Sequence, residues 1–330
     1  MLEILREHSA SGINRFQECT QKYHYEYVDG FEPVAKSTAM TCGTILHVGQ
    51  EAYWTGSSLE EAIQLMEEET KTNGWHEDPL FLPKVRTYLR GYYNKWRALD
   101  DLEKDRYHVI GIEESFSYPS GVDGALLAGR IDGVLYDSKD DVTIILEHKG
   151  TESKLAQEAS STYWDKLHMD TQLHLYADYL VKKYNRPVQG LWDVTITSPK
   201  SKPAGKKKIA KRKVETPEDF AYRKAENMED VGEFEARLTA TYMGDPTKYI
   251  RRRIPILDHR LERKMAEITL VVHRMQNGFT PIRNTNACPK FGGCSYMDVC
   301  LGYAELKDSP RFQKRIKPKK KIKIKNPLPF

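Results

Sequence analysis

Long apolar stretches are missing from this sequence of 330 residues. No apolar run approaches the roughly 18 residues that a helix needs to span a bilayer. The first ten residues, MLEILREHSA, also lack the basic segment followed by an apolar one that makes up a secretory signal. We therefore expect a soluble protein of the cytoplasm that does not contact a membrane. A hydrophobic content of 39% allows a large core, in one large domain or two smaller ones.

Acidic residues are absent from two strongly basic segments. Residues 200–213, KSKPAGKKKIAKRK, contain eight Lys or Arg, and residues 311–330 contain nine. Removing these 17 positive charges from the net charge of +4 leaves −13 on the rest of the chain. Basic segments on an acidic body suggest contact with a polyanion, most simply the phosphates of nucleic acid. The alternative is that both segments are solvated and flexible, without a ligand.

Cysteine is scarce, with five residues at positions 19, 42, 288, 294 and 300. In a cytosolic protein, clustered thiols more often bind metal than form disulfides. The last three cysteines fall in CPKFGGCSYMDVC, with five residues in each gap. The sequence therefore predicts a metal site near the C-terminal end of the chain. Cys42 has no such neighbours and is most simply a small buried hydrophobic residue.

Helical and strand patterns alternate along the chain, without an internal repeat or a phosphate-cradling glycine-rich loop after a strand. Helices are expected in residues 9–28, from residue 41 to 54, through residues 58–100, and in residues 161–184 and 258–276. Strands are expected in residues 107–118, 125–137, 141–150, 190–198 and 248–257. Strands in the middle, helices on both sides and no long βαβ alternation favour an α/β or α+β sheet covered by helices.

One predicted strand ends in charge. Residues 143–152 read TIILEHKGTE, so an apolar strand runs into Glu147 and Lys149. Residues two apart share a face of a strand, which places Ile145, Glu147 and Lys149 on one side. Burying a carboxylate and an ammonium is costly unless they are paired or bind a metal. Taken alone, the pattern is also typical of a Glu–Lys pair at a solvent-exposed strand end.

The hairpin before this charged end provides a geometric test. If residues 138–141 form a four-residue loop, Asp137 pairs with Val142 and Asp132 lies across from Glu147 on the same face. A five-residue loop would move Asp132 to the opposite face, because a slip of one residue inverts every side chain. Two carboxylates beside a lysine suit Mg²⁺ or Mn²⁺ and phosphodiester hydrolysis. Alone, Asp132 is equally well explained as a turn or surface aspartate.

Four short motifs occur in a fixed order: GTILH at residues 43–47, GRIDG around Asp132, EHK at residues 147–149 and QLHLY at residues 172–176. In this order they resemble the RecB-like branch of the PD-(D/E)xK nuclease superfamily, over roughly residues 9–300. One early cysteine and three late ones are similar to the iron–sulfur subset of these nucleases, which includes AddB-type and CRISPR-associated relatives. The resemblance implies a restriction-endonuclease-like α/β fold, with a mixed central sheet flanked by helices.

The resemblance also implies roles for the residues of these motifs. His47, Asp132 and Glu147 would ligate Mg²⁺ or Mn²⁺, with help from the backbone carbonyl of His148. Because His47 adds a nitrogen ligand, Mn²⁺ would suit the site better than Mg²⁺ does. Lys149 would position or activate the attacking water. These five residues are the candidate metal-binding and catalytic set.

Two further residues would support this set. Gln172 and Tyr176, one helical turn apart, would contact the DNA backbone or brace the site; simple helix packing is the alternative. One departure from the family pattern is Ile131, which stands where the superfamily nominally has a proline.

The cysteines would hold a cofactor that joins the two ends of the chain. Cys19, Cys288, Cys294 and Cys300 would ligate a [4Fe–4S] cluster. Zinc or another cluster type stays open, because the family often has a closer pair among its last three cysteines.

The expected organisation is a single nuclease domain over residues 1–310 and a flexible basic tail over residues 311–330. Within the domain we expect a helical insertion at residues 58–100, a basic loop at residues 199–214, and a cysteine-rich region at residues 286–302 that closes on Cys19.

The expected function is a metal-dependent DNA exonuclease that acts on DNA ends or single strands in recombination, repair or phage DNA processing. CRISPR-adaptation DNA trimming, a catalytically weak DNA-end-binding scaffold, and a zinc-stabilised end-binding protein are the alternatives. A recombination or replication protein is a further candidate partner, through the basic tail. The setting would be the cytoplasm of a bacterial, phage-infected or prophage-bearing cell.

Overall fold

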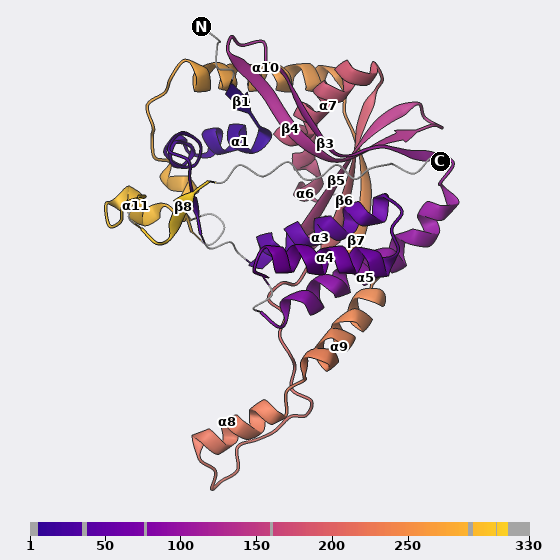
Figure 1. Cartoon of the computed structure of the whole chain (residues 1–330), viewed down its shortest axis with the longest axis vertical. Coiled ribbons are helices and arrows are strands. Elements are labelled where there is room, and N and C mark those ends of the chain that lie inside the picture. Colours follow the sequence, from indigo (N-terminus) through magenta and orange to yellow (C-terminus); the bar gives the residue numbers. More distant parts are fainter. Residues whose placement is uncertain are drawn as a thin grey trace.

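Six strands form the central sheet of the protein, and helices cover both of its faces (Figure 1). The computed structural model describes residues 6–34, 38–75, 78–158, 161–289, 293–307 and 309–315. Within these ranges, no helix is both long enough and apolar enough to cross a membrane. The predicted α/β fold with a mixed central sheet is confirmed, and the layers bury apolar surface on both sides of the sheet.

The sheet divides at strand β4. Its strands are β1 (Arg6–His8), β3 (Tyr107–Pro119), β4 (Ala125–Asp137), β5 (Val142–Thr151), β6 (Val188–Ile196) and β7 (Tyr249–Pro255). β3 pairs with nearly the whole length of β4, whereas β1 pairs with residues 125–127 and β5 with residues 133–137. β5 and β6 are parallel, and the other long pairs are antiparallel. Asp132 therefore lies just beyond the point where β4 leaves its pairing with β5.

The hairpin between β4 and β5 has the predicted four-residue loop. Asp137 pairs with Val142, and the ladder runs inward to Gly133 opposite Leu146. The Asp137 carboxylate fixes this turn by accepting hydrogen bonds from the backbone N–H groups of Lys139 and Asp140, at 3.1 and 3.3 Å. This register places Asp132 and Glu147 one step beyond the end of the ladder, on adjacent strands.

Three helices cover one face of the sheet: α1 (Ala10–Glu18), α7 (Thr171–Tyr184) and α10 (Asp258–Gln276). α1 begins at Ser9, whose side chain accepts a hydrogen bond from the backbone N–H of Gly12. Apolar residues of these helices join sheet residues such as Ile145 in one buried cluster. Because Glu147 follows Ile145 by two residues, its side chain also faces the α7 layer.

The other face is covered by α3 (Thr38–Trp54), α4 (Leu59–Thr72), α5 (Phe81–Leu102) and α9 (Val231–Met243), which share a second apolar cluster. The predicted helical insertion at residues 58–100 corresponds to α4 and α5. Ile144 and Leu146 of β5 pack against Trp54 of α3. His148, two residues after Leu146, points into this helical layer and is 1% exposed.

Two predicted helices are interrupted. The segment 9–28 breaks at Cys19, whose backbone is extended between α1 and α2 (Thr20–Tyr23), and it continues as a π-helical turn over His24–Val28. The segment 161–184 divides into α6 (Thr162–Asp165), a 3-10 turn and α7. Asp170 causes the second break, because its side chain caps α7 by accepting from the backbone N–H of Leu173 at 2.8 Å.

A second, two-stranded sheet was not predicted. It pairs β2 (Phe31–Pro33) with β8 (Phe312–Lys314), next to α11 (Met297–Leu301). Phe312 stacks on Tyr296 at a ring distance of 5.0 Å and is buried with Phe31. The flexible tail predicted from residue 311 is therefore wrong for residues 312–314, and residues 316–330 lie outside the described part. Strands of three residues are too short to produce a readable alternation.

Candidate active site

Side chains from four elements converge at the charged end of β5. α3 contributes His47, β4 contributes Asp132, β5 contributes Glu147 and Lys149, and α7 contributes Gln172. The Asp132 carboxylate accepts a hydrogen bond from the backbone N–H of His148 at 2.9 Å, and it lies 3.7 Å from Nδ1 of His47. The structure thus brings together the residues of all four sequence motifs.

Glu147 is the most buried acid of this group, with 2% of its surface exposed. Its Oε1 atom accepts hydrogen bonds from Gln172 at 2.7 Å and from the Lys149 ammonium. Its Oε2 atom is buried and has no hydrogen-bond partner among the described residues. Leaving a buried carboxylate oxygen without a donor or a cation is costly. Burial raises the pKa of Glu147 to about 7, although Lys149 acts in the opposite direction.

Lys149 supplies a fixed positive charge beside Glu147. Burial opposes its ionisation, but the Glu147 carboxylate raises the pKa of Lys149 above its usual value. The ammonium also lies 3.5 Å from Oε1 of Gln172 and 5.6 Å from the centre of the Trp192 ring. A lysine that stays protonated can orient water or offset phosphate charge, but it cannot accept a proton.

Gln172 and Tyr176 link α7 to the two strands that carry the carboxylates. Gln172 donates to Glu147 and to the Tyr176 hydroxyl, the latter at 3.1 Å. That hydroxyl in turn donates to the backbone carbonyl of Arg130 at 2.7 Å. Tyr176 is 6% exposed. Of the two predicted roles, this geometry favours bracing of the site over direct DNA contact for Tyr176.

His47 is held in its neutral form. Burial lowers the pKa of His47 to about 4, against the attraction of Asp132. The neutral imidazole is the form that ligates metals. Its ring lies edge-on to the ring of His148, with 5.8 Å between centres. His47 therefore has the protonation state that the predicted ligand role requires.

A buried ionic network behind His148 was not predicted. Asp193 of β6 pairs in register with His148, and its Oδ2 atom lies 3.4 Å from Nδ1 of the His148 ring. Burial opposes ionisation of Asp193, but Arg251, His148 and Tyr92 together outweigh burial and lower the pKa of that carboxyl. Arg251 donates to Asp193 at 3.1 Å and to Asp100 at 2.7 and 2.8 Å. This network fixes the strand whose backbone N–H holds Asp132.

Cys19, Cys288, Cys294 and Cys300 lie in neighbouring segments, and Cys294 packs against the aromatic cluster of the small second sheet. The backbone N–H of Asn284 is 3.5 Å from Sγ of Cys19, and the Cys288 thiol lies 3.7 Å from the Asn284 carbonyl. Cys294 donates its backbone N–H to the Cys288 carbonyl at 2.8 Å. Burial raises the pKa of Cys300, and Cys294 and Cys19 are close enough to add to that rise. The segment around Cys19 therefore lies beside the segment that contains Asn284 and Cys288.

Cys42 stands apart from these four thiols. It is 2% exposed in the helical layer around α3, and burial raises its pKa to about 11. Its environment agrees with the prediction of a small buried hydrophobic residue.

Neither site is arranged as a finished metal centre. Among the residues that the structure describes, no three His, Cys, Asp or Glu side chains are placed to hold a metal ion. At the end of β5, protein groups already contact one oxygen of each carboxylate. His148 and His47 contact Asp132, and Lys149 and Gln172 contact Glu147. The Oε2 atom of Glu147 is a buried carboxylate oxygen of this group that has no hydrogen-bond partner among the described residues.

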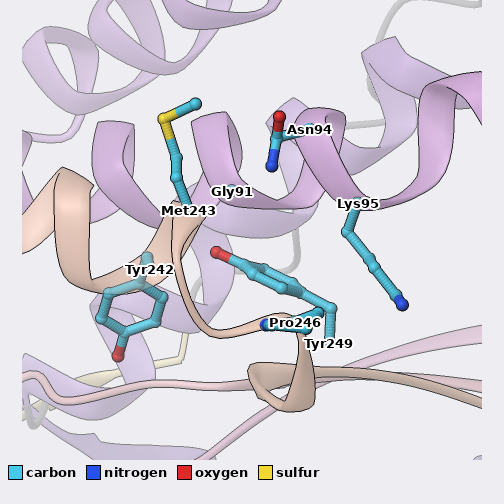
Figure 2. Close-up of a pocket in the computed structure, with 7 residues that line it drawn as sticks. All are labelled: Gly91, Asn94, Lys95, Tyr242, Met243, Pro246 and Tyr249. Atoms are coloured by element: carbon cyan, nitrogen blue, oxygen red, sulfur yellow. The ribbon is translucent and has the colours of Figure 1, made fainter.

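A small cavity of about 180 Å³ lies elsewhere, between α5, α9 and the start of β7 (Figure 2). Tyr249 and Tyr242 form part of its wall, and the Tyr249 hydroxyl donates to the backbone carbonyl of Tyr88 at 3.0 Å. None of the predicted site residues lines it. The chemistry at the end of β5 is thus on a different part of the molecule.

The raised pKa of Glu147 predicts a pH-dependent stability of the metal-free protein. Its folded-state pKa of about 7 exceeds the value of 4.5 for an ordinary glutamate. The contribution of Glu147 to stability is therefore complete at low pH and is lost as the pH rises through about 7. The test measures the free energy of unfolding by urea, in EDTA, for wild type and Glu147→Gln. Between about pH 5 and about pH 8.5, wild type should lose more of this free energy than Glu147→Gln does. A difference that does not change with pH would contradict the predicted burial of this charge.

A solved structure from Eubacterium rectale, provisionally described as an exonuclease, has 13% sequence identity to this chain and a TM-score of 0.49. The match covers 91% of this chain and 89% of that one. No curated protein matches the chain in sequence. Residues 7–301 match the sequence profile of the PD-(D/E)XK nuclease superfamily, and the chain belongs to that superfamily.

Proposed function

We propose that the protein is a metal-dependent DNA nuclease of the RecB-like branch, which acts as an exonuclease on DNA ends or single strands. The observation that carries the proposal is the buried, unpartnered Oε2 atom of Glu147, beside Asp132 and the charged Lys149. Membership of the superfamily supports nuclease chemistry. The two basic segments support a polyanionic substrate.

The donor set fits a divalent cation. Asp132 and Glu147 offer carboxylate oxygens, His47 a neutral nitrogen, and the His148 carbonyl a fourth candidate ligand. When bound, Mg²⁺ or Mn²⁺ would stabilise charge on the phosphate and lower the pKa of a water. A cation held there would replace the present contact of Asp132 with His47, whereas Lys149 contacts the other oxygen of Glu147, Oε1.

The protein's own residues would then position the substrate. The Lys149 ammonium, which lies beside Glu147, would orient the attacking water or offset charge on the scissile phosphate. Gln172 and Tyr176 keep Glu147 and β4 in place. Asp193 and Arg251 hold the His148 segment from behind. This division of roles separates the groups near the phosphate from those that brace them.

Cleavage of end-labelled DNA tests the proposal. Purified protein is incubated with single-stranded and duplex DNA, labelled at either end, in Mg²⁺, Mn²⁺ or EDTA. We expect degradation in both metals, faster in Mn²⁺ because of the His47 nitrogen, and none in EDTA. Mononucleotides or short products released from one end would identify an exonuclease. Metal-independent binding without cleavage would overturn the proposal in favour of a DNA-binding scaffold.

We also propose that Cys19, Cys288, Cys294 and Cys300 ligate a [4Fe–4S] cluster, with zinc as the alternative. Support comes from the shared contacts of Cys19 and Cys288 with Asn284 and from the proximity of Cys300 to Cys294 and Cys19. Ligation would require the four thiols to move closer together than they lie now. The cluster would join segments separated by most of the chain.

Removal of one of these thiols should cost both cofactor and stability. Cys19→Ala should lose iron and sulfide after anaerobic purification and lower the free energy of unfolding by several kcal/mol, roughly, because metal binding is coupled to folding. Cys42→Ala is the matched control and should keep its metal. Zinc without iron in anaerobic wild type would contradict the cluster, and a fully loaded, stable Cys19→Ala would contradict the ligand set.

A further inference from the structure

A slender arm projects from the body of the protein. It comprises residues 200–230, including α8 (Pro217–Glu226), and extends away from α9 (Figure 1). The segment predicted as a basic loop, residues 199–214, forms the outgoing part and contains no helix or strand. None of the residues of α8 is buried. A helix in a globular protein normally buries one face, so this one has some other role than core packing.

The arm is nonetheless held in a defined shape. Its two sides are joined near the base by backbone bonds between Ala204 and Glu229 and between Lys206 and Asn227, at 2.9 and 2.7 Å. The Asn227 side chain adds bonds to both backbone groups of Lys207. α8 begins at Thr216, which caps it, and has Pro217 in its first turn. Local sequence therefore specifies this helix without help from the core.

Two acidic residues of the arm, Glu215 and Glu229, are bonded to arginines within it or at its base. Glu215 accepts two hydrogen bonds from Arg223, both at 2.8 Å, and one from the backbone of Arg212 at 2.9 Å. Glu229 is engaged in the same way by Arg237 at the base of the arm. These acids stabilise the turn and do not neutralise the lysines around it.

The lysines of the arm are exposed, and most of them have no ion-pair partner among the described residues. Within the part of the chain that the structure describes, only Lys206 of the eight basic residues in positions 200–213 forms an ion pair, with Glu233 at 2.6 Å. Four other exposed lysines have no acidic partner there: Lys207, Lys208, Lys211 and Lys213. Two apolar or aromatic side chains beside them are also uncovered, since Val214 is 99% exposed and Tyr222 is 68% exposed.

The arm begins at the same end of the sheet as the candidate active site. β6 runs parallel to β5, with Val194 opposite Lys149 and Ile196 opposite Thr151. The next residue, Thr197, donates its backbone N–H to the Thr151 carbonyl at 2.7 Å. The chain enters the basic segment three residues later, at Lys200. A polymer that leaves the end of β5 can therefore pass directly onto the arm.

We propose that this arm binds the phosphates of a DNA strand whose scissile phosphate lies at the end of β5. The identity of the polyanion rests on the proposed function, whereas the arm's role as its binding surface rests on the unpaired lysines and their position. Lysine contacts to phosphates displace counterions and need no base sequence. The uncovered Tyr222 can stack on a base. The arm would therefore bind the part of the DNA strand beyond the cleavage site, and the protein would bind long strands more tightly than short ones.

The test removes charge from the arm without touching its internal bonds. The arm variant carries Lys→Ala at positions 207, 208, 211 and 213. A control variant removes four exposed, unpaired charges from other parts of the surface, by Lys→Ala at positions 71, 104 and 139 and Arg260→Ala. Both variants change the net charge equally, so any difference between them reflects position. Circular dichroism and thermal unfolding verify that both are folded.

Binding is measured by fluorescence anisotropy in EDTA, with a labelled single strand of about 30 nucleotides, at several salt concentrations. We expect the arm variant to bind about tenfold more weakly than the control variant and to lower the salt slope by up to about 3. In Mg²⁺ or Mn²⁺, both variants should cleave a strand of about six nucleotides at wild-type rates, because such a strand does not reach the arm.

Equal affinity and equal salt slope in the two variants would overturn the proposal, and so would capture of a protein by the arm with no change in DNA binding. Loss of cleavage of the short strand as well would also overturn it, because the arm would then act on the site itself. Since binding is read in EDTA, its result stands even if wild type cleaves nothing. Failure of the arm and failure of the nuclease assignment are therefore distinguishable.

Discussion

Glu147→Gln should abolish DNA cleavage while leaving the fold intact. The amide keeps the size of the side chain and can still contact Gln172 and Lys149, but it removes the negative charge on the unpartnered Oε2 position. Each ~1.4 kcal/mol of lost transition-state stabilisation lowers the rate tenfold. Because a metal contact contributes several kcal/mol, we expect the cleavage rate to fall by about a thousandfold or more. The initial rate of release from end-labelled DNA in Mn²⁺ measures this effect.

A matched exposed acid supplies the control for this substitution. Glu60→Gln changes the same chemical group on α4, where the side chain faces solvent and lies outside the candidate site. It should cleave at the wild-type rate. Thermal unfolding should show both variants folded, and only wild type and Glu60→Gln should be stabilised by added Mn²⁺. Wild-type activity in Glu147→Gln would exclude this glutamate as a metal ligand.

Arg251→Ala should produce the largest loss of stability. The Arg251 side chain is 10% exposed and is surrounded by aromatic rings. The guanidinium carbon lies 4.2 Å from the ring centre of Trp96 and 4.8 Å from that of Trp54. Its removal leaves Asp193, which is fully buried, without its main counter-charge. Breaking a buried pair by removing one partner costs about 3–5 kcal/mol. Urea unfolding at neutral pH should show a loss of this size.

Arg263→Ala is the control for the arginine substitution, since 85% of that side chain is exposed. It should change stability by no more than about 0.5 kcal/mol. A second variant, Asp193→Asn, removes the charge that Arg251 balances and keeps the side-chain shape. If Arg251→Ala unfolds at the same urea concentration as wild type, the buried network does not support the fold.

The chemistry of the β5 end was accessible from sequence because it depends on short-range rules. The apolar run before Glu147 predicts a strand, and the SKDD turn predicts the loop that sets Asp132 opposite it. Alternation then determines which residues share a face. The placement of Asp132 beside Glu147 therefore follows from the register of one hairpin.

Contacts between segments that are distant in the sequence could not be predicted by these rules. Asp193 stands alone in the apolar strand GLWDVTITS, which is a signal for a buried polar contact. Its neighbour His148, however, is fixed by the parallel register of β5 and β6 across a long helical connection. The partner Arg251 arrives from a third strand, in the run RRR, where alternation alone does not identify the inward residue.

The ends of the chain show the opposite error, an ordered segment predicted as flexible. The composition of residues 311–330 is dominated by lysine, and this obscured Phe312, which is buried against Tyr296 and Phe31. One aromatic residue and three backbone pairs are enough to hold β8 on β2 when the surrounding surface is already folded.

The most direct test of the account is the location of a bound cation. A crystal of the protein soaked in Mn²⁺ would be measured at the manganese absorption edge, and an anomalous difference map would be calculated. The account predicts a peak within coordination distance of Glu147 Oε2 and Asp132, near His47, and its disappearance in Glu147→Gln. A map without a peak there, from protein that cleaves DNA in Mn²⁺, would contradict it.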